Sequence, residues 1–175
     1  AGILGAGVID STGRMEERAS LRSDGRSRFA TRIHQQGRQR SFELVHASEG
    51  ASGRAIEVTQ RDVRELQLAK GAIRAGIEIL LKEVAVRPED VKRVYLAGAF
   101  GNYIKPESAL AIGLLPRFPK AEIVPVGNAA GSGAKMALLS TSARTEASQI
   151  VEKTEYLELS ARPDFQEHFM EAIIF

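Results

Sequence analysis

The sequence predicts an α/β fold in which helices cover the faces of a sheet. Strand and helix patterns alternate through the second half of the 175 residues, which is typical of α/β layer architectures. One long amphipathic helix precedes them at residues 59–84, and one predicted strand ends in glycines while another runs directly into a Gly-Asn pair. Because 43% of the residues are hydrophobic, the chain can bury one sizeable core. We therefore expect one domain, or one lobe of something larger.

The first 58 residues are expected to form an N-terminal segment of this lobe that carries a β-hairpin. Two short runs with β-branched and aromatic residues flank Gln36 and Gly37, which is a hairpin pattern. Eight arginines between Arg14 and Arg40 make the stretch locally basic, although the formal net charge of the chain is only +2. Arginines spaced among Ser, Gly and Asp favour a solvated loop or hairpin face, and an anionic partner docking there is the alternative.

The most strongly periodic segment is residues 59–84, which opens the second expected unit, residues 59–175. Thr59 is a good N-cap, and Asp62 places a carboxylate near the free amides of the first turn. Gly71 and Gly76 each cost about 1 kcal/mol relative to alanine inside a helix, so we expect a neighbouring element to pack closely there. Apolar side chains recur at intervals of three, four or seven, and hence on one face, at Val63, Leu66, Ile73, Ile77, Leu80 and Val84.

The remaining residues carry the alternating elements. Strand patterns lie at residues 91–100, 122–126 and 156–160, and helical patterns lie at residues 106–116, 127–154 and 163–175. Pro106 suits a first helical position and Pro116 suits a helix end.

Two strands run into glycine-bearing turns that are candidate ligand sites. In VYLAGAFGNYI, residues 94–104, two glycines and an amide follow a strand. Ligands of α/β sheets sit beyond the carboxyl ends of strands, where glycine lets a flat or charged group approach the backbone. The pattern G-A-F-G-N is neither G-x-G-x-x-G nor a lysine-bearing P-loop, so a nucleotide turn and a tightly packed bend are both open.

The second turn lies in VPVGNAAGSGAKMAL, residues 124–138, where a helix of small residues follows Gly127 and Asn128. Free amides at a helix N-terminus can bind an anion, and small residues at three- and four-residue spacing also let a helix lie close to a neighbour. We favour close packing for Gly131, Gly133 and Ala134.

Several kinds of site are not expected. The chain has no cysteine, which excludes disulfides and cysteine-ligated zinc or iron–sulfur sites within these residues. Its histidines, His34, His46 and His168, are far apart in the sequence, so no metal site is expected. No nucleophile elbow or triad is present, so no catalytic residue is assigned. The small net charge, the lack of a long apolar run and the lack of a signal peptide predict a cytoplasmic protein that binds neither nucleic acid nor membrane.

Polar residues of helix 59–84 are expected at or beside its exposed side. Most charges placed like those of Glu65, Lys70 and Arg74 form solvated pairs along a helix. The alternative is that Gln67, Lys70 or Arg74 reaches a bound nucleotide.

Four stretches, in this order, resemble the C-terminal part of the reductive activators of corrinoid-dependent methyltransferases. They are VTQRDVRELQLAKGAIRAGIEILL, VYLAGAFGNYIKPESALAIGLLP, VGNAAGSGAKMALLS and YLELSARPDFQEHFMEAIIF. These activators are ATP-using iron–sulfur proteins of the superfamily that contains acetate and sugar kinases, heat-shock chaperones and actin. The resemblance runs from about Gly2 to Phe175, and the basic stretch at residues 14–40 is its least distinctive part.

The resemblance implies one lobe of an actin-like ATPase, with a ribonuclease-H-like mixed sheet, flanking helices and the hairpin as an N-terminal insertion. It places the start of the second connecting helix at residues 127–134, where that helix would let two lobes shear over the nucleotide. The nucleotide-binding residues it implies are Gly98, Ala99, Phe100, Gly101 and Asn102, followed by Gly127 and Asn128.

The resemblance also implies cofactors and partners. ATP with Mg²⁺ would be shared with a first lobe, and an iron–sulfur cluster would lie in another domain of the full-length protein. Family members are thought to use ATP to drive an electron from that cluster to cob(II)alamin in a corrinoid protein or methyltransferase, which restores cob(I)alamin. We therefore expect the C-terminal piece of a longer activator, inactive alone. The alternative is a non-catalytic module that docks a corrinoid protein through its basic face or forms a homodimer.

Overall fold

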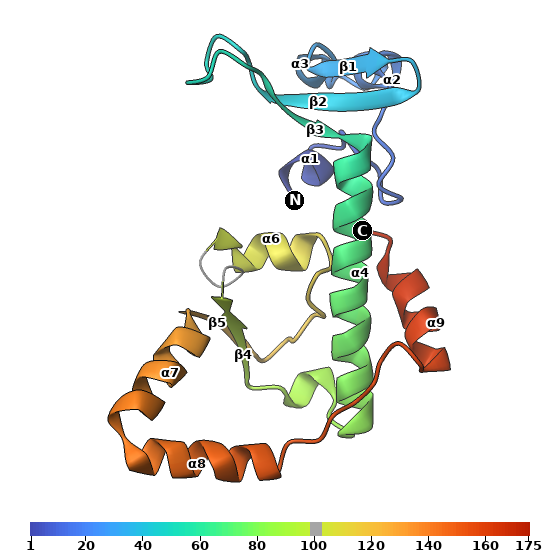
Figure 1. Ribbon diagram of the computed structural model, residues 1–175. Helices are drawn as coiled ribbons and strands as arrows, with labels where there is room; N and C mark the ends of the chain where they lie inside the picture. The colour runs from blue at the N-terminus through green and yellow to red at the C-terminus, as the bar shows by residue number, and fades with distance from the viewer. Residues whose placement is uncertain (99–102) are drawn as a thin grey trace.

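A single long helix forms the spine of the molecule. The computed structural model describes residues 1–98 and 103–175 (Figure 1). Helix α4, Gln60–Glu83, begins at the predicted N-cap Thr59, whose side chain accepts a hydrogen bond from the Asp62 amide while the Asp62 carboxylate accepts one from the Thr59 amide. This reciprocal capping box satisfies two amides that the helix leaves without partners. The predicted helix is confirmed.

An antiparallel sheet lies at the N-terminal end of α4 (Figure 1). Strands β1, Ile33–Gln36, and β2, Gln39–Val45, form the predicted hairpin, and β2 also pairs with β3, Ile56–Thr59. The sequence analysis missed β3, because four residues after a glycine-bearing segment give too short a pattern. It also did not predict three short helices: α1, Gly2–Gly5, α2, Arg18–Ser23, and α3, Ser27–Ala30.

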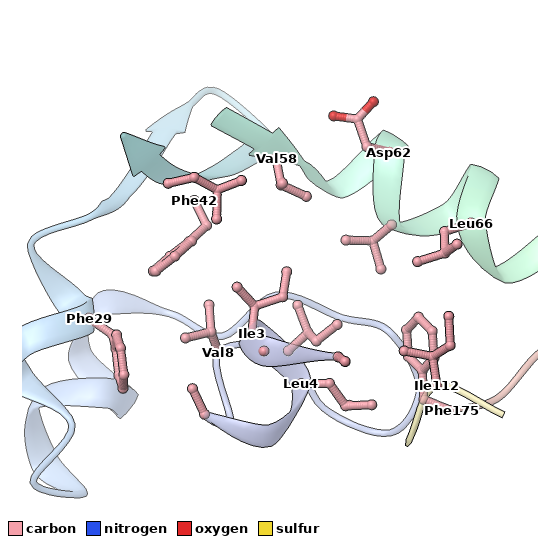
Figure 2. A pocket seen from close by; sticks show the side chains of 16 residues that line it. Ile3, Leu4, Val8, Phe29, Phe42, Val58, Asp62, Leu66, Ile112 and Phe175 are labelled. Atoms are coloured by element: carbon pink, nitrogen blue, oxygen red, sulfur yellow. The ribbon is translucent and has the colours of Figure 1, made fainter. Parts of the chain in front are cut away.

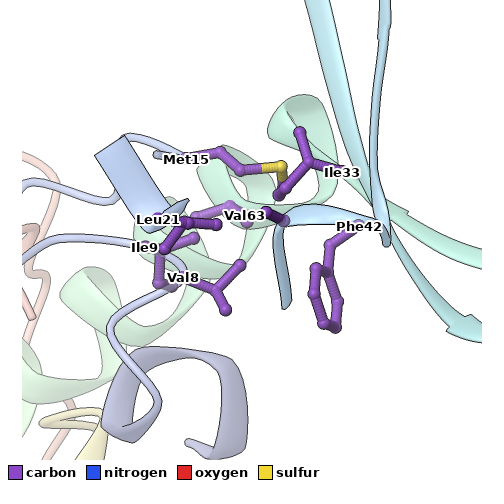
Figure 3. Packing of buried hydrophobic residues seen from close by; sticks show 8 residues of the cluster. Val8, Ile9, Met15, Leu21, Ile33, Phe42 and Val63 are labelled. Atoms are coloured by element: carbon purple, nitrogen blue, oxygen red, sulfur yellow. The ribbon is translucent and has the colours of Figure 1, made fainter. Parts of the chain in front are cut away.

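The main core lies between this sheet, the N-terminal segment and the first turn of α4. Figure 3 shows how the side chains of Val8, Met15 and Leu21 meet those of the sheet and of α4. Side chains of a strand alternate between its faces, so Ile33 and Phe42 face this core while His34, Ser41 and Glu43 face the other side of the sheet. The full cluster of buried residues is Val8, Ile9, Met15, Leu21, Ala30, Ile33, Phe42 and Val63.

A second, parallel sheet lies beside the lower part of α4. The chain passes through a short 3-10 helix, Pro88–Asp90, into β4, Arg93–Ala97, then α6, Pro106–Ala111, and β5, Glu122–Gly127. Strands β4 and β5 run parallel, with α6 in the crossover between them. The predicted α/β architecture is confirmed, and its strands fall into two sheets among the described residues. A second core of Ala109, Ile112, Leu114 and Leu115 belongs to this crossover and packs against Leu96 of β4, Ile123 of β5 and Ile77 of α4.

Three helices complete the chain: α7, Ala129–Leu139, α8, Thr141–Glu152, and α9, Pro163–Ala172. Ser140 separates α7 from α8, because its hydroxyl caps α8 by accepting from the Ala143 amide. The predicted strand at residues 156–160 is wrong, since this segment has no regular structure and no described strand pairs with it. Its Glu158 carboxylate instead accepts hydrogen bonds from Tyr156 and Ser160.

The glycines of α4 mark close contacts, as predicted. Helix α9 packs along α4 (Figure 1), and a Cβ atom on Gly71 would lie 3.3 Å from Ile173 and 3.4 Å from Phe169. A Cβ atom on Gly76 would lie 3.2 Å from Leu159. The helix-propensity cost of both glycines is therefore offset by the close approach of the C-terminal segment.

Helices α7 and α8 are largely exposed. Neither helix contains a buried residue, and both carry exposed apolar side chains, at Met136, Leu138, Leu139, Ile150 and Val151. The chain exposes 12125 Å² in total. A compact monomer of 19.0 kDa is expected to expose about 8400 Å². The exposed area is therefore larger than that of a compact monomer, and the exposed apolar side chains of α7 and α8 are available for contact with another lobe or chain. Among the described residues, no helix combines the length and apolarity needed to cross a membrane.

Candidate functional site

The two predicted glycine turns meet at one edge of the parallel sheet. Gly98 directly follows β4, Gly127 is the last residue of β5, and Ala97 and Gly127 are register partners. Both glycines have positive φ angles, 70° at Gly98 and 61° at Gly127, in the region that side chains other than glycine rarely adopt. Among the described residues, no atom would lie within 4 Å of a Cβ atom on Gly98, so their packing does not require this glycine. Gly98 and Gly127 thus lie at the carboxyl ends of the two parallel strands.

Helix α7 begins one residue beyond this edge. Asn128 is its N-cap, and the Asn128 Oδ1 atom accepts a hydrogen bond of 2.9 Å from the Gly131 amide. A Cβ atom on Gly131 would lie 2.6 Å from Asn128 Nδ2, so Gly131 makes room for the cap. The close packing expected for Gly133 and Ala134 is not found among the described residues, since a Cβ atom on Gly133 would have no neighbour within 4 Å and Ala134 is exposed.

The site thus brings Gly98, Gly127 and Asn128 together. The remaining predicted residues of the first turn, Ala99, Phe100, Gly101 and Asn102, lie outside the described residues. What is described combines strand carboxyl ends, a backbone in the left-handed region and the N-terminus of a helix, a combination suited to a ligand with a flat part and an anionic part.

Gln67 and Lys70 lie on a covered face of α4. Both are buried, with exposed fractions of 4% and 1%, whereas Lys70 was expected at or beside the exposed side of the helix. The Gln67 amide donates to the Thr12 and Ile173 carbonyls at 2.9 and 3.1 Å, and the Lys70 ammonium donates to the Ile174 carbonyl. The exposed-side expectation failed because the chain end folds back over this face of α4.

Arg74 also contacts the backbone. Its guanidinium donates to the Leu115 carbonyl at 3.0 Å and pairs with Glu78 one turn further along α4. Among the described residues, Gln67, Lys70 and Arg74 share no hydrogen bond or cavity with Gly98 or Gly127. The hydrogen bonds of these three side chains hold the chain end and the segment after α6 against α4.

The environment of Lys70 is unusual for a cation. Its Nζ atom lies 5.2 Å from the centre of the Phe175 ring, and no carboxylate of the described residues pairs with it. Burial, and to a smaller extent the nearby charge of Arg74, lower the pKa of Lys70 from its ordinary value of 10.5.

A large apolar cavity has neither Gly98 nor Gly127 in its lining. It measures about 630 Å³ and is lined by α1, the antiparallel sheet and α4, with Phe175 at one side (Figure 2). The Asp62 carboxylate at its edge is used in the capping box and points away from the cavity. Since a nucleotide needs polar partners for its phosphates, this cavity does not suit a nucleotide.

One possible cation-ligating group was missed by the sequence analysis. His34, Glu43 and Glu57 come from three different strands, and their ligand atoms lie within 4.8 Å of one another on the polar face of the antiparallel sheet. Because the ligands are far apart in sequence, only knowledge of the strand register could have found them. The His34 Nε2 atom lies 3.3 Å from the Glu43 carboxylate, a pair that is ionic only when the imidazole is protonated.

The fold and this edge define an α/β lobe with a candidate ligand site at the carboxyl ends of its parallel strands. The sequence model of the family described as the C-terminal domain of RACo, the ASKHA domain, matches residues 1–175, so the chain belongs to this family. ASKHA denotes the superfamily of acetate and sugar kinases, heat-shock proteins and actin, a class of nucleotide-binding domains. The family and architecture predicted from the sequence are thereby confirmed.

Similar proteins bear names that concern corrinoid activation. The corrinoid activation enzyme RamQ of Eubacterium limosum is 33% identical over 182 residues, which covers 97% of this chain and 30% of the relative. A [Co(II) methylated amine-specific corrinoid protein] reductase of Methanosarcina barkeri is 32% identical over 120 residues, 67% of this chain and 22% of the relative.

A solved structure supports the same family. The structure of a reductive activator for corrinoid, iron–sulfur protein superposes with a TM-score of 0.82 at 34% identity, over 98% of this chain and 26% of that one. The chain therefore spans less than a third of the length of each of these three similar proteins.

Proposed function

We propose that this chain is the nucleotide-binding lobe of an ATP-dependent reductive activator of corrinoid proteins. The observation that carries the proposal is the meeting of Gly98 and Gly127 at the carboxyl ends of β4 and β5. In a family of ASKHA domains, such an edge is where the adenosine of ATP would lie. Gly98 and the turn that follows it would admit the base or ribose, and Asn128 would keep α7 in place beside it.

ATP and Mg²⁺ would be shared with a second lobe. The exposed apolar surface of α7 and α8 supports such an arrangement, because it offers a contact for another part of a longer protein. The residues of this chain would bind the nucleoside and close over it, while Mg²⁺ supplies charge neutralisation to the phosphates when bound. A nucleotide can shift the two lobes only by as much as its affinity differs between their arrangements.

The redox step would take place outside this chain. With no cysteine, these residues hold no cysteine-ligated iron–sulfur cluster, so the electron for cob(II)alamin would come from another domain. The names of the three similar proteins support a corrinoid protein as the partner. Nucleotide-driven lobe movement would couple ATP to that uphill electron transfer.

The alternative is a docking module without a nucleotide site. The basic character of residues 14–40 favours it, since a local excess of arginines attracts the anionic groups of a partner. Under this alternative the glycine turns are structural bends, and replacing their glycines by larger residues does not change the affinity for ATP.

Replacing Gly98 by alanine in the intact protein is expected to weaken ATP binding by about tenfold or more, equal to about 1.4 kcal/mol. The added methyl group would lie beside Gly98, where we place the nucleoside. Calorimetric titration with ATP and Mg²⁺ measures the change.

Gly25→Ala is the matched control for this measurement. Gly25 has a φ angle of 73°, close to the 70° of Gly98, and a Cβ atom there would also meet no atom within 4 Å. Both variants therefore carry similar backbone strain, and only Gly98→Ala should lose affinity. Equal ATP affinity in both variants and in the wild type would make the turn a structural bend.

A further inference from the structure

Four arginines surround a cavity of about 380 Å³ between the N-terminal loop, the hairpin and α4. Arg14 comes from the loop, Arg38 and Arg40 from the hairpin, and Arg64 from the second turn of α4. The sequence analysis treated the first three as part of a basic stretch and did not include Arg64. These four residues, far apart in the chain, are brought together by the docking of the sheet on α4.

The positive charge around this cavity is poorly balanced. Glu17 is the only carboxylate of the described residues that pairs with any of the four arginines, and it serves both Arg40 and Arg14, the latter at 3.6 Å. Neither Arg38 nor Arg64 takes part in an ion pair between described residues. Like charges gathered around a cavity repel one another, and an anion bound among them would remove that cost.

The walls of the cavity are fixed rather than loose. The Gln60 amide donates to the Gly13 carbonyl and accepts from the Met15 amide, both at 2.7 Å, and buried Gln67 donates to the Thr12 carbonyl. Arg40 is 17% exposed and donates to the Met15 carbonyl at 2.7 Å. A site whose supporting groups are already held loses little entropy when its ligand binds.

We propose that this cavity binds a small anion that carries two or more phosphate groups. Guanidinium groups have a planar set of donors that matches phosphate oxygens two at a time. Several arginines around one cavity favour a multiply charged ligand over a single phosphate. The volume lies within the range of about 300–1000 Å³ typical of small-molecule sites, and its concavity favours a small molecule over the acidic surface of a protein. The site is separate from the glycine turns.

Pyrophosphate is the probe, titrated by calorimetry into the intact protein at low ionic strength. Arg64→Gln and Arg38→Gln are each expected to weaken its binding about tenfold or more, the effect of losing one charge-assisted contact. Arg61→Gln is the matched control, because Arg61 lies one turn before Arg64 on α4 and does not line the cavity. It is 84% exposed and makes one loose ion pair with Glu65 at 3.9 Å. This variant should leave the affinity unchanged, and so should Gly98→Ala.

A second measurement, the shift in melting temperature on ligand binding, distinguishes a loss of binding from misfolding of a variant. Pyrophosphate should raise the melting temperature of the wild type and of Arg61→Gln, and raise it less in Arg64→Gln, since a ligand stabilises only the state that binds it. The proposal is overturned if pyrophosphate does not bind, or if Arg64→Gln and Arg38→Gln bind it as the wild type does. Binding of a polyglutamate peptide but not of pyrophosphate would also overturn it, in favour of an acidic protein segment.

Discussion

Gly13→Ala is expected to destabilise the fold by about 2–5 kcal/mol. Gly13 has a φ angle of 83°, and a Cβ atom there would lie 2.4–2.6 Å from the side-chain amide of Gln67. The backbone strain costs about 1–2 kcal/mol. The displaced amide would lose its bonds to Thr12 and Ile173, and a buried polar group without a partner costs about 1–3 kcal/mol. Urea unfolding measures the difference.

Gly25→Ala separates these two causes. Gly25 has a similar φ angle of 73° but open space around its Cβ position, so this variant should show the backbone strain alone, about 1–2 kcal/mol. If Gly13→Ala were no more destabilising than Gly25→Ala, the Gln67 amide would not be holding the N-terminal loop and the chain end together.

Lys70→Ala is expected to cost about 2–4 kcal/mol of stability. The side chain fills a fully buried position and its ammonium donates to the Ile174 carbonyl, so truncation leaves a cavity and an unpaired carbonyl. Lys82→Ala serves as the control on the same helix. Lys82 is 63% exposed and pairs with Asp164 at 3.2 Å, an arrangement that typically contributes little. Similar losses in both variants would contradict the buried role of Lys70.

The cost of Lys70→Ala should also depend on pH. Burial lowers the pKa of Lys70 in the folded state below 10.5, so the unfolded chain binds more protons between the two values. The contribution of Lys70 to stability therefore grows as the pH rises toward 10.5. The difference in unfolding free energy between wild type and Lys70→Ala should widen over that interval, and a difference that stays constant would mean that the amine is well solvated.

Local patterns were sufficient for most of the fold. The periodicity of residues 59–84, with Thr59 and Asp62 at its start, predicted α4, and its two glycines predicted that another element packs against it. These features depend only on residues that are neighbours along the chain or around one helix turn. The residues 156–160 show the limit, because alternation predicts a strand only where a partner strand is available.

The features that the sequence analysis did not predict depend on contacts between residues far apart in the chain. The burial of Gln67 and Lys70 depends on the return of Ile173 and Ile174 to α4, about a hundred residues later in the chain. The arginine cavity likewise depends on the docking of the hairpin beside α4. By contrast, the edge at Gly98 and Gly127 follows from two local turns and the parallel pairing of their strands, so it could be proposed as a site from the sequence.

Photolabelling of the intact protein with 8-azido-ATP is the most direct test of the nucleotide site, because the reactive group sits on the adenine. We predict that the label falls in peptides that contain residues 93–104 or 127–134, and that excess ATP prevents it. Label confined to other peptides, or label within these peptides that excess ATP does not reduce, would contradict the assignment of the β4–β5 edge as the nucleotide site.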